Sequence, residues 1–452
     1  MAGTFKNKAE SPHDYVLERA LITSPQFVDG ASIDIKNVIT DIEIFEHLDK
    51  PYLTGNIILV DDNNIYNNVN FSGSEKISLK FSLLDPDSTP IEKDFIIEKT
   101  IKNARANDKQ SALVFHIVEQ HAFDSTIINV NKAYSGKPVE IIQSIITDNL
   151  GKTFSSPIVL DSQEPIKVLI PNLTPLEAAT WVRDRATTID GAPFYFFSTL
   201  ANDNLHIIPL DDMLATPPDP KPYVYSQITT SIASSRSIDD QAYLIQEFKS
   251  KSNDNIISLV RMGYVGSQNY FYNPITGTPV SNVGSFFNLA EVLNTLKNKD
   301  VIRSNQNQFG YASNYEINGV SFSQVRSKIR TDITPTNTYV DINNYSEAAN
   351  VGKHKLKIIS EALRELIVRN SIDIALPGRN FLNGRYSNTI GNQIKLRFLA
   401  TSTATNTNVE QIDTKKSGDY LMYAVKHHFK KERYDVIASC VKLADLNEEP
   451  IE

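Results

Sequence analysis

The strongest constraint on the fold is a short residue pattern that occurs twice, once near each end of the chain. Ile77–Phe81 and Ile394–Phe398 both alternate three apolar residues with polar or cationic ones. A period of two is that of a β-strand with one buried and one solvent-facing side. A single match of this kind carries little weight, because all amphipathic strands share the period.

The segments that follow the repeated pattern also return, and in the same order. They are Asp94–Lys102 and Leu113–Val118 in the first copy, and Asp419–His427 and Val436–Val441 in the second. Gly73 and Gly391 precede the two copies, where a tight turn favours a residue that tolerates positive φ. The alternative is that unrelated amphipathic strands merely look alike. We favour a duplicated β-module, and no short repeat of solenoid length lies between the copies.

The composition is that of a globular protein with an acidic balance. The 452 residues include 45 Lys and Arg against 53 Asp and Glu, which gives a net charge of −8. The length suggests about three domains. An acidic chain gains little from neutralising phosphates, which disfavours a dedicated nucleic-acid binder. The acidic balance is compatible with a surface along which nucleic acid passes without binding.

Cysteine usage and hydropathy predict the compartment. Cys440 is the only cysteine and lies inside the last strand pattern, where a thiol is usually a small buried hydrophobe. No intramolecular disulfide is possible, and folding in a reducing compartment is expected. Residues 1–20 lack the apolar segment of a signal peptide, and no run of about 18 apolar residues occurs. We therefore expect neither a secreted precursor nor a membrane-spanning protein.

The periodicity predicts a β-rich α+β chain of several domains. Residues 1–121 alternate as an antiparallel barrel or sandwich without helices. Residues 122–220 change period: a helix over 138–150 ends at Gly151, a capping box at Thr174–Glu177 begins another, and two short strands follow. We interpret 122–220 as a small α/β domain that ends in a proline-rich linker.

The second β-module is predicted to be split. It comprises 221–265 and 366–452, interrupted by an insertion over 266–365 that contains a helix after Ser346. Within it, 244–248 and 255–264 resemble a hairpin, and 371–376 alternates as a strand.

No pattern predicts catalytic, metal-binding or cofactor-binding residues. Gly151-Lys152-Thr153 lacks the upstream glycine of a phosphate-binding loop, because Ile146 stands there. His427 and His428 are adjacent on a strand and should point to opposite faces. The paired acids Asp61-Asp62, Asp211-Asp212 and Asp239-Asp240 suggest a two-carboxylate hydrolase, but each lies among turn residues and is better interpreted as a solvated bend. We therefore expect a structural or interaction protein that is not an enzyme.

The hairpin tips after the repeated strands are basic in an otherwise acidic chain. The residues are Lys102, Arg105 and Lys109 in the first copy, and Lys426, Lys430, Lys431 and Arg433 in the second. If the modules are equivalent, these side chains form a ring of positive charge that docks an acidic partner. The alternative is that charged tips serve solubility alone.

Three ordered motifs carry a resemblance to a known family. They are Tyr52–Asp62 followed by Gly73 and Ile77–Phe81, Ile170–Ala179 with Trp181 and Arg185-Ala186, and Gly418–His427. With these motifs the chain resembles the central baseplate hub proteins of contractile-tailed bacteriophages, and is similar to the N-terminal part of type VI secretion spike proteins. The segment over 266–345 lies outside the resemblance.

The resemblance implies a homotrimer with two tail-tube-like β-barrels in each chain, which gives a ring of near-sixfold symmetry. Such a ring joins the hexameric tail tube, or a tube-initiator protein, to the trimeric central spike, and DNA passes through its lumen without specific binding. It implies no cofactor, and a place in the virion baseplate after folding in the host cytoplasm. Two alternatives stay open: a phage-associated hydrolase of cell-wall glycans, and a carbohydrate-binding β-protein that uses Tyr270, Phe271 and Tyr272.

Overall fold

The computed structural model describes most of the chain. The described residues are 9–27, 31–61, 65, 71–85, 88–105, 111–155, 165–225, 237–252, 256–273, 278–279, 285–288, 316–321, 324, 326, 328–333, 347–368, 370–382, 389–399, 412–413, 416–431 and 433–442. The sequence also predicts a weak helix around Leu289–Leu296, and this segment lies outside the described residues.

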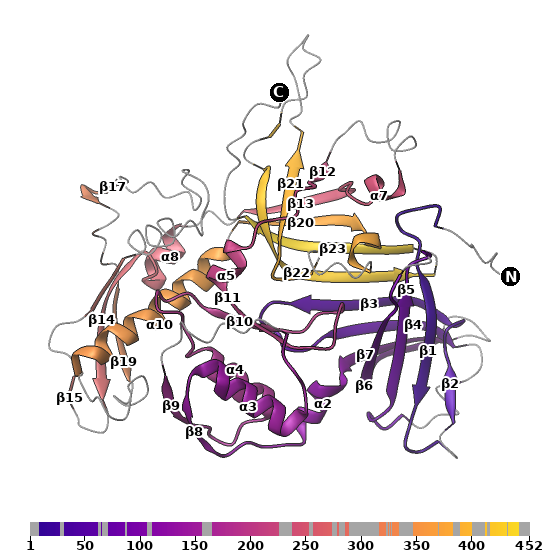
Figure 1. The fold of residues 1–452 in the computed structure, drawn as a ribbon, viewed down its shortest axis with the longest axis horizontal. Coiled ribbons are helices and arrows are strands. Elements are labelled where there is room, and N and C mark those ends of the chain that lie inside the picture. The colour runs from indigo at the N-terminus through magenta and orange to yellow at the C-terminus, as the bar shows by residue number, and fades with distance from the viewer. Residues whose placement is uncertain are drawn as a thin grey trace, which may run out of the picture.

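Most strands join one large sheet. Its strands are β1 (Val16–Thr23), β2 (Ser32–Asp34), β3 (Ile39–His47), β4 (Thr54–Asp61), β5 (Lys76–Ser82), β6 (Ile91–Arg105), β7 (Ser111–Glu119), β12 (Tyr223–Tyr225), β13 (Glu247–Ser252), β20 (Asn370–Pro377), β21 (Gln393–Phe398), β22 (Gly418–Lys430) and β23 (Arg433–Lys442). Neighbours follow the order β13-β20-β23-β22-β3-β4-β7-β6-β5-β1-β2, and β21 pairs with both β22 and β12. The sheet runs through both copies of the repeated pattern, with β22 directly above β3 (Figure 1).

The two copies have the same strand pairing. We call β3 to β7 the first repeat, and β13 with β20 to β23 the second repeat. In the first repeat Ser78 lies opposite Asp94, and in the second Lys395 lies opposite Asp419. These residues hold the same place in the aligned patterns, so the register is equivalent. The strand order β3-β4-β7-β6-β5 likewise corresponds to β13-β20-β23-β22-β21.

A shared irregularity strengthens the equivalence. The β6–β7 ladder shifts register between Ile97 and Lys99, and the β22–β23 ladder shifts between Met422 and Ala424. The extra residues, Glu98 and Tyr423, occupy the same position in the repeat. A β-bulge of this kind re-aims a strand and is a specific feature of a fold. Gly73 and Gly391 also share positive φ values of 86° and 83°, as their turn positions predict.

The repeats differ at their outer strands. β1 pairs antiparallel with β5, whereas β12 pairs parallel with β21. The sheet is therefore antiparallel except at this edge of the second repeat. A bridge between Val224 and Leu244 also ties β12 to the residues just before β13.

The alternating residues of both repeats face one continuous core. Ile77, Leu79 and Phe81 of β5 are fully buried, and Ile394, Leu396 and Phe398 of β21 are nearly so. One cluster of buried residues includes side chains from both repeats. Burial of such aliphatic and aromatic side chains stabilises a fold by about 1.5–3 kcal/mol each, so the two repeats stabilise one another.

A small mixed region follows the first repeat. It contains α2 (Gln120–Thr126), β8 (Ala133–Gly136), α3 (Pro138–Leu150), β9 (Ile166–Leu169), α4 (Pro175–Arg183), β10 (Phe194–Phe197), β11 (His206–Pro209) and α5 (Leu210–Ala215). α3 ends at Gly151 with φ 63°, and α4 begins at a capping box of Thr174 and Glu177, so both helix predictions are confirmed. α3 and α4 share a separate core with β9 and β10, below the large sheet (Figure 1).

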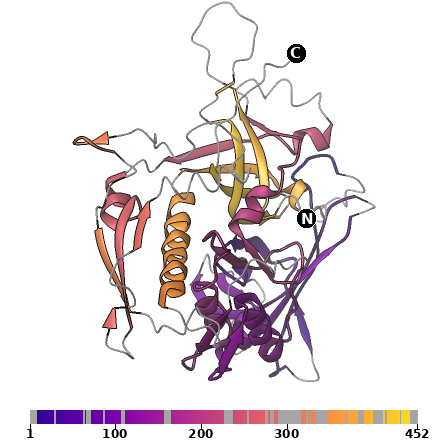
Figure 2. The ribbon, with the colours of Figure 1, turned by 60° about the vertical axis from the view of Figure 1, so that its left-hand side comes forward.

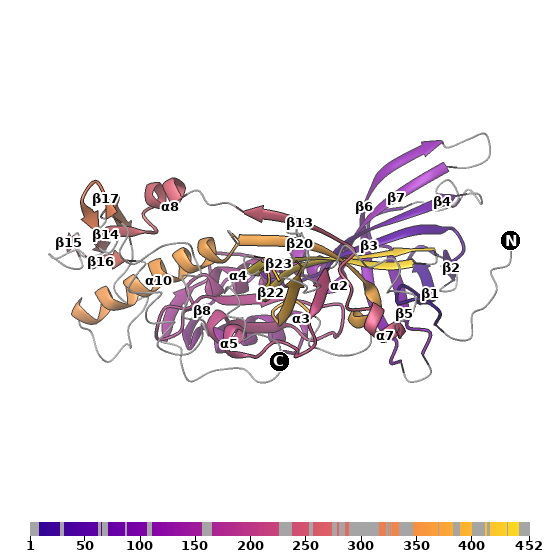
Figure 3. The same ribbon diagram turned by 90° about the horizontal axis from the view of Figure 1, so that it is seen from above.

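The segment between β13 and β20 holds a second small sheet and a long helix. Its elements are α8 (Ile256–Met262), β14 (Gly266–Asn273), β15 (Thr278–Pro279), β16 (Ser285–Asn288), β17 (Glu316–Ile317), β18 (Val320–Ser321), β19 (Lys328–Ile333) and α10 (Glu347–Ile367). α10 stands beside the sheet of β14, β16 and β19 (Figure 2). Seen from above, this sheet and the free ends of β6 and β7 lie at opposite ends of the molecule (Figure 3).

One element of the second module was predicted wrongly. Residues 255–264 were expected to form the second strand of a hairpin, but α8 occupies this segment. Ile256 and Val260 are four residues apart, which is helical spacing, and β13 pairs instead with β20. Two short helical elements complete the chain, α7 (Ile238–Gln241) and the 3₁₀ turn η5 (Gly378–Phe381).

Candidate assembly surfaces

The two repeats are joined by a strand that serves both. The first part of β22 pairs with β21, whereas its second part pairs antiparallel with β3 of the first repeat. This junction runs from Ala424 opposite His47 to Lys430 opposite Asp41. The edge of the second repeat is therefore continued by the first strand of the first repeat.

A buried polar cluster lies at this junction. Glu46 of β3 and His427 of β22 are only 3% and 2% exposed, and Oε1 of Glu46 lies 3.2 Å from Nε2 of His427. The other ring nitrogen of His427 is hydrogen-bonded to the Tyr434 hydroxyl at 2.7 Å. Burial, reinforced by the charge of Glu46, raises the pKa of Tyr434, which keeps this hydroxyl neutral. The cluster fixes how the repeats meet, because buried polar groups need matched partners.

A second cluster ties the helices to the same junction. Asp49 follows β3, and its Oδ1 accepts hydrogen bonds from Nη1 of Arg183 at 3.2 Å and Nη1 of Arg364 at 3.1 Å. Its Oδ2 accepts one from the hydroxyl of Tyr423 at 2.8 Å. Tyr423 is the bulge residue of β22, so α4, α10 and the second repeat converge on one carboxylate.

Among the strand edges that lack a partner strand in the described part of the chain, those of β6 and β13 are related by the repeat to paired edges. β6 pairs with β5 only over Ile91–Ile96, and from Lys99 to Arg105 it pairs with β7 alone. β13 pairs with β20 on one side only. The open stretch of β6 corresponds to the part of β22 that pairs with β3, and β13 corresponds to β3 itself.

The predicted basic residues fall into three groups. Lys430, Lys431 and Arg433 are exposed at the β22–β23 turn, where Arg433 contacts Asp435 at 2.6 Å. Lys426 lies within β22, and its Nζ is 2.6 Å from Oε1 of Glu43, so its charge is already paired. Lys102 and Arg105 belong to β6, but their side chains lie outside the described residues, as does Lys109. One basic tip is thus brought together, without Lys426.

The residues of the alternative functions have local contacts. Asp61 is buried and accepts from the Ile65 amide at 2.8 Å, while Asp62 lies outside the described residues. Asp239 contacts Arg379 at 2.8 Å, and Asp240 contacts Lys221 at 2.7 Å.

The remaining acidic pair and the aromatic run are also placed. Asp211 and Asp212 stand in the first turn of α5, where burial raises both pKa values. Tyr270 in β14 is 39% exposed, whereas the side chains of Phe271 and Tyr272 lie outside the described residues. Among the described residues no group of acidic, histidine or cysteine side chains is arranged to hold a metal ion. Nor does any described helix have the length and hydropathy to cross a membrane.

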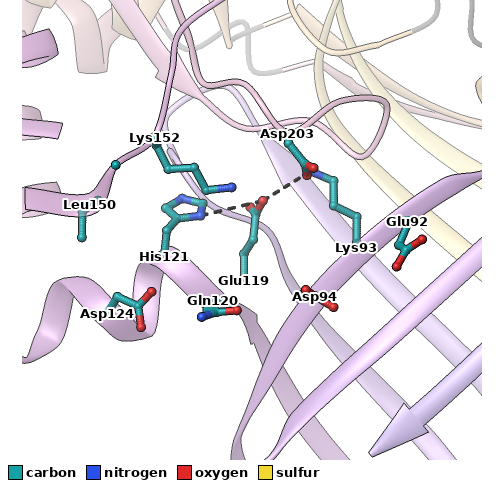
Figure 4. A pocket seen from close by; sticks show the side chains of 11 residues that line it. Glu92, Lys93, Asp94, Glu119, Gln120, His121, Asp124, Leu150, Lys152 and Asp203 are labelled. Carbon is teal, nitrogen blue, oxygen red and sulfur yellow. Dashed lines mark hydrogen bonds and ion pairs between the residues drawn. The ribbon is translucent and has the colours of Figure 1, made fainter. Parts of the chain in front are cut away.

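A polar pocket of about 570 Å³ lies between the first repeat and the small mixed region that follows it (Figure 4). Lys93 of β6 is 3% exposed, and its Nζ lies 3.3 Å from Oε1 of Glu119 and 2.8 Å from Oδ1 of Asp203. Nζ also donates to the carbonyl of Asn202 at 2.6 Å. Lys93 thus joins Glu119 of β7 to Asn202 and Asp203, so we interpret this cluster as a clamp that holds the β10–β11 turn.

The carboxylate of Glu119 is the centre of that clamp. Its Oε2 accepts hydrogen bonds from the Leu53 amide at 3.0 Å and from the Ser198 hydroxyl at 2.9 Å. Burial alone would raise the pKa of Glu119, but Lys93, His121 and these hydrogen bonds outweigh it and hold the pKa below its usual range. Glu119 therefore stays ionised inside the protein.

Sequence reasoning missed these buried polar residues although a signal was present. Lys93 falls between Ile91 and Phe95 in the alternation of β6, and Glu119 follows Phe115 and Ile117 in β7. Glu46 and His427 hold corresponding places after Ile44 and Val425. A polar residue at an inward position of an amphipathic strand must find a buried partner.

Comparisons with known proteins identify the fold. No family model and no curated protein matches the chain. The 43 kDa tail protein of prophage MuSo2 from Shewanella oneidensis matches with a TM-score of 0.50 and 9% identity, over 94% of this chain and 98% of that one. The tail protein from Neisseria meningitidis MC58 matches with a TM-score of 0.50 and 8% identity, over 95% and 97%. The chain therefore shares the fold of these two tail proteins.

Proposed function

We propose that this chain, whose fold is that of phage tail proteins, is a structural hub of a tail baseplate. Three copies form a ring in which each contributes two similar β-barrels, so that a threefold assembly presents six near-equivalent units. One side joins the hexameric tail tube or its initiator, and the other holds the trimeric central spike.

The repeat carries this proposal. Five strands recur in the same order and register, with a bulge at the same place. The second repeat also pairs with the first, because β22 forms an antiparallel ladder with β3. Contact between two different surfaces is the geometry from which closed rings are built. Two such units in a chain reconcile a trimer with a sixfold neighbour.

The charge balance is compatible with DNA passage through the lumen. A net charge of −8 makes the chain repel phosphate on average, so DNA can move through without being held. On this proposal the chain works in the virion and performs no reaction.

The mass of the assembly in solution tests the proposal. We expect light scattering across a concentration series to approach three chain masses for the chain alone, or three chain masses plus the mass of the bound spike after mixing with the spike protein of the same phage. A particle that remains one chain, or closes at two, with the spike present would rule out the trimeric hub.

A further inference from the structure

The junction between the repeats indicates how a second copy would continue the sheet. Within one chain, Ala424–Lys430 of β22 pairs with Asp41–His47 of β3. The equivalent of that β22 segment is the open stretch of β6, and the equivalent of β3 is β13. Both equivalents are unpaired on the relevant side among the described residues. One chain therefore carries both strands that a second junction of this kind needs. They are the open stretch of β6, in the first repeat, and β13, in the second repeat.

We infer that the open edge of β6 pairs antiparallel with β13 of a second copy of this chain, repeating between chains the junction that β22 and β3 make within one. The inference rests on the proposed ring and specifies its interface. Because the two edges differ, each copy offers a β6 edge to one neighbour and a β13 edge to the other.

The register of the β22–β3 ladder within one chain determines the register expected between β6 of one copy and β13 of the next. Val425 lies opposite Glu46 in the β22–β3 ladder. Val425 pairs with Ala438 as Thr100 pairs with Phe115, so Thr100 is its equivalent in β6.

The partner position follows from the neighbouring ladders. Phe45 lies opposite Thr54, and Lys251 lies opposite Ser371, which is the equivalent of Thr54. The next residues, Glu46 and Ser252, are then equivalent as well. Thr100 of one copy should therefore lie opposite Ser252 of the next.

The open edge of β6 carries an exposed apolar side chain, which favours its burial against another strand. Ile101 is the extra residue of a second bulge between Thr100 and Lys102, which β22 lacks. Its side chain is 52% exposed in the single chain. An exposed strand edge with an apolar residue is a site of pairing unless something covers it. A second copy provides that cover.

The competing interpretation is that both edges are protected and stay unpaired. Lys249 and Lys251 of β13 are exposed, and lysines on edge strands discourage pairing between molecules. Lys251 contacts Asp373 of the adjacent strand at 2.5 Å, which neutralises part of that charge. Cross-linking separates the two interpretations.

The test is disulfide trapping between two single variants, Thr100→Cys and Ser252→Cys, mixed at equal concentration under mild oxidant. Opposed residues of an antiparallel pair have Cα atoms about 4.5–5.5 Å apart, which is within the range of about 4.4–6.8 Å that a disulfide spans. The only native cysteine, Cys440, is fully buried, so it should not compete. We expect a covalent dimer that contains one copy of each variant.

The matched control is Thr100→Cys mixed with Ser250→Cys, which shifts the register by two residues on the same strand. Diagonal positions are about 7–8 Å apart, so the in-register pair should cross-link about tenfold faster. Equal rates, or cross-linking mainly within each variant alone, overturn the inference.

The double variant Thr100→Cys/Ser252→Cys separates this inference from the proposed function. A covalent ladder that ends at three chains supports both. In-register cross-links that end at another number retain the strand pairing and reject the trimer. A trimer by mass with no in-register cross-link retains the hub and rejects the pairing.

Discussion

The two repeats share strand order and pairing but have largely different side chains. Both share strand order, register, a bulge and a glycine of positive φ before the pattern, yet Glu98 occupies the bulge in the first repeat and Tyr423 in the second. The comparison teaches that alternation and turn geometry are enough to specify this module. The side chains at equivalent positions are then free to take separate roles.

At one pair of opposed core positions, the two repeats place the larger side chain on different strands. Gly55 lies opposite Ile117 in the first repeat, and Ile372 lies opposite Cys440 at the equivalent place in the second. A Cβ on Gly55 would meet the carbonyl oxygen of Glu43 at 2.4 Å and Cγ1 of Ile117 at 3.1 Å. Small and large residues have exchanged strands, which keeps the core filled.

The largest expected difference between the repeats concerns buried charge. Glu119→Ala leaves Lys93, whose side chain is 2% exposed, without its buried carboxylate. Breaking a buried ion pair on one side costs about 3–5 kcal/mol, measurable as the free energy of unfolding in urea. The equivalent of Glu119 in the second repeat is Lys442, and Lys442→Ala should cost under about 1 kcal/mol. Equal losses would show that the clamp is not specific to the first repeat.

The same carboxylate predicts an acid response. The pKa of Glu119 is lower in the folded protein than the unfolded value of about 4.3. Its stabilisation is therefore present above that unfolded value and is lost as the pH falls through the folded pKa. We expect Glu119→Gln to be less stable than the native chain at pH 6, with the difference shrinking toward pH 3. A difference independent of pH would contradict the ionised state.

The next largest effect concerns Gly55 and its equivalent Ile372, where the two repeats place the larger side chain on different strands. Gly55→Ala should destabilise the first repeat by about 1–3 kcal/mol, because the added methyl group meets backbone that cannot move without separating β3 from β4. Ile372→Val at the equivalent position removes one methyl group and should cost about 0.5–1.5 kcal/mol. Thermal unfolding of the two variants compares them directly, and a neutral Gly55→Ala would refute the close approach.

A smaller effect tests the two bulges. Tyr423→Phe removes one hydrogen bond to Asp49, which keeps Arg183 and Arg364, so we expect a loss of about 1.5 kcal/mol. Glu98→Gln at the other bulge weakens a half-exposed contact with His116, so the change should stay below about 0.5 kcal/mol. If both changes cost the same in urea unfolding, the bulges do not have different roles.

The smallest effect on stability concerns the basic tip. Lys430→Glu with Lys431→Glu alters exposed side chains, so the free energy of unfolding should change by less than about 0.5 kcal/mol. If the tip docks an acidic partner, incorporation of the variant into assembled tails should fall sharply. The control is Lys167→Glu, an exposed lysine of β9 far along the chain from the tip. Equal incorporation of both variants would assign the tip to solubility alone.

Much of the local structure was predictable from sequence because its determinants are local. Gly151 and the Thr174–Glu177 capping box marked helix ends, and the structure confirms both. His427 is buried and His428 is partly exposed, as neighbours on a strand should be. Cys440 is buried, as its strand pattern indicated.

The unpredicted features are those that depend on distant segments. The ladder between β22 and β3 joins residues near 44 and 427, and no local pattern records such a pairing. The partners of Lys93 and Glu46 are likewise set by tertiary structure, although their inward positions were visible in the alternation. α8 was misassigned because a short apolar run fits a strand as well as a helix.

The central claim is that each chain contributes two equivalent units to a threefold ring. Electron microscopy of the purified particle, with its spike partner if assembly requires one, tests it most directly. We expect class averages of an annulus with six similar lobes related by threefold symmetry. A particle without a central opening, or an annulus with only one lobe per chain, would contradict it.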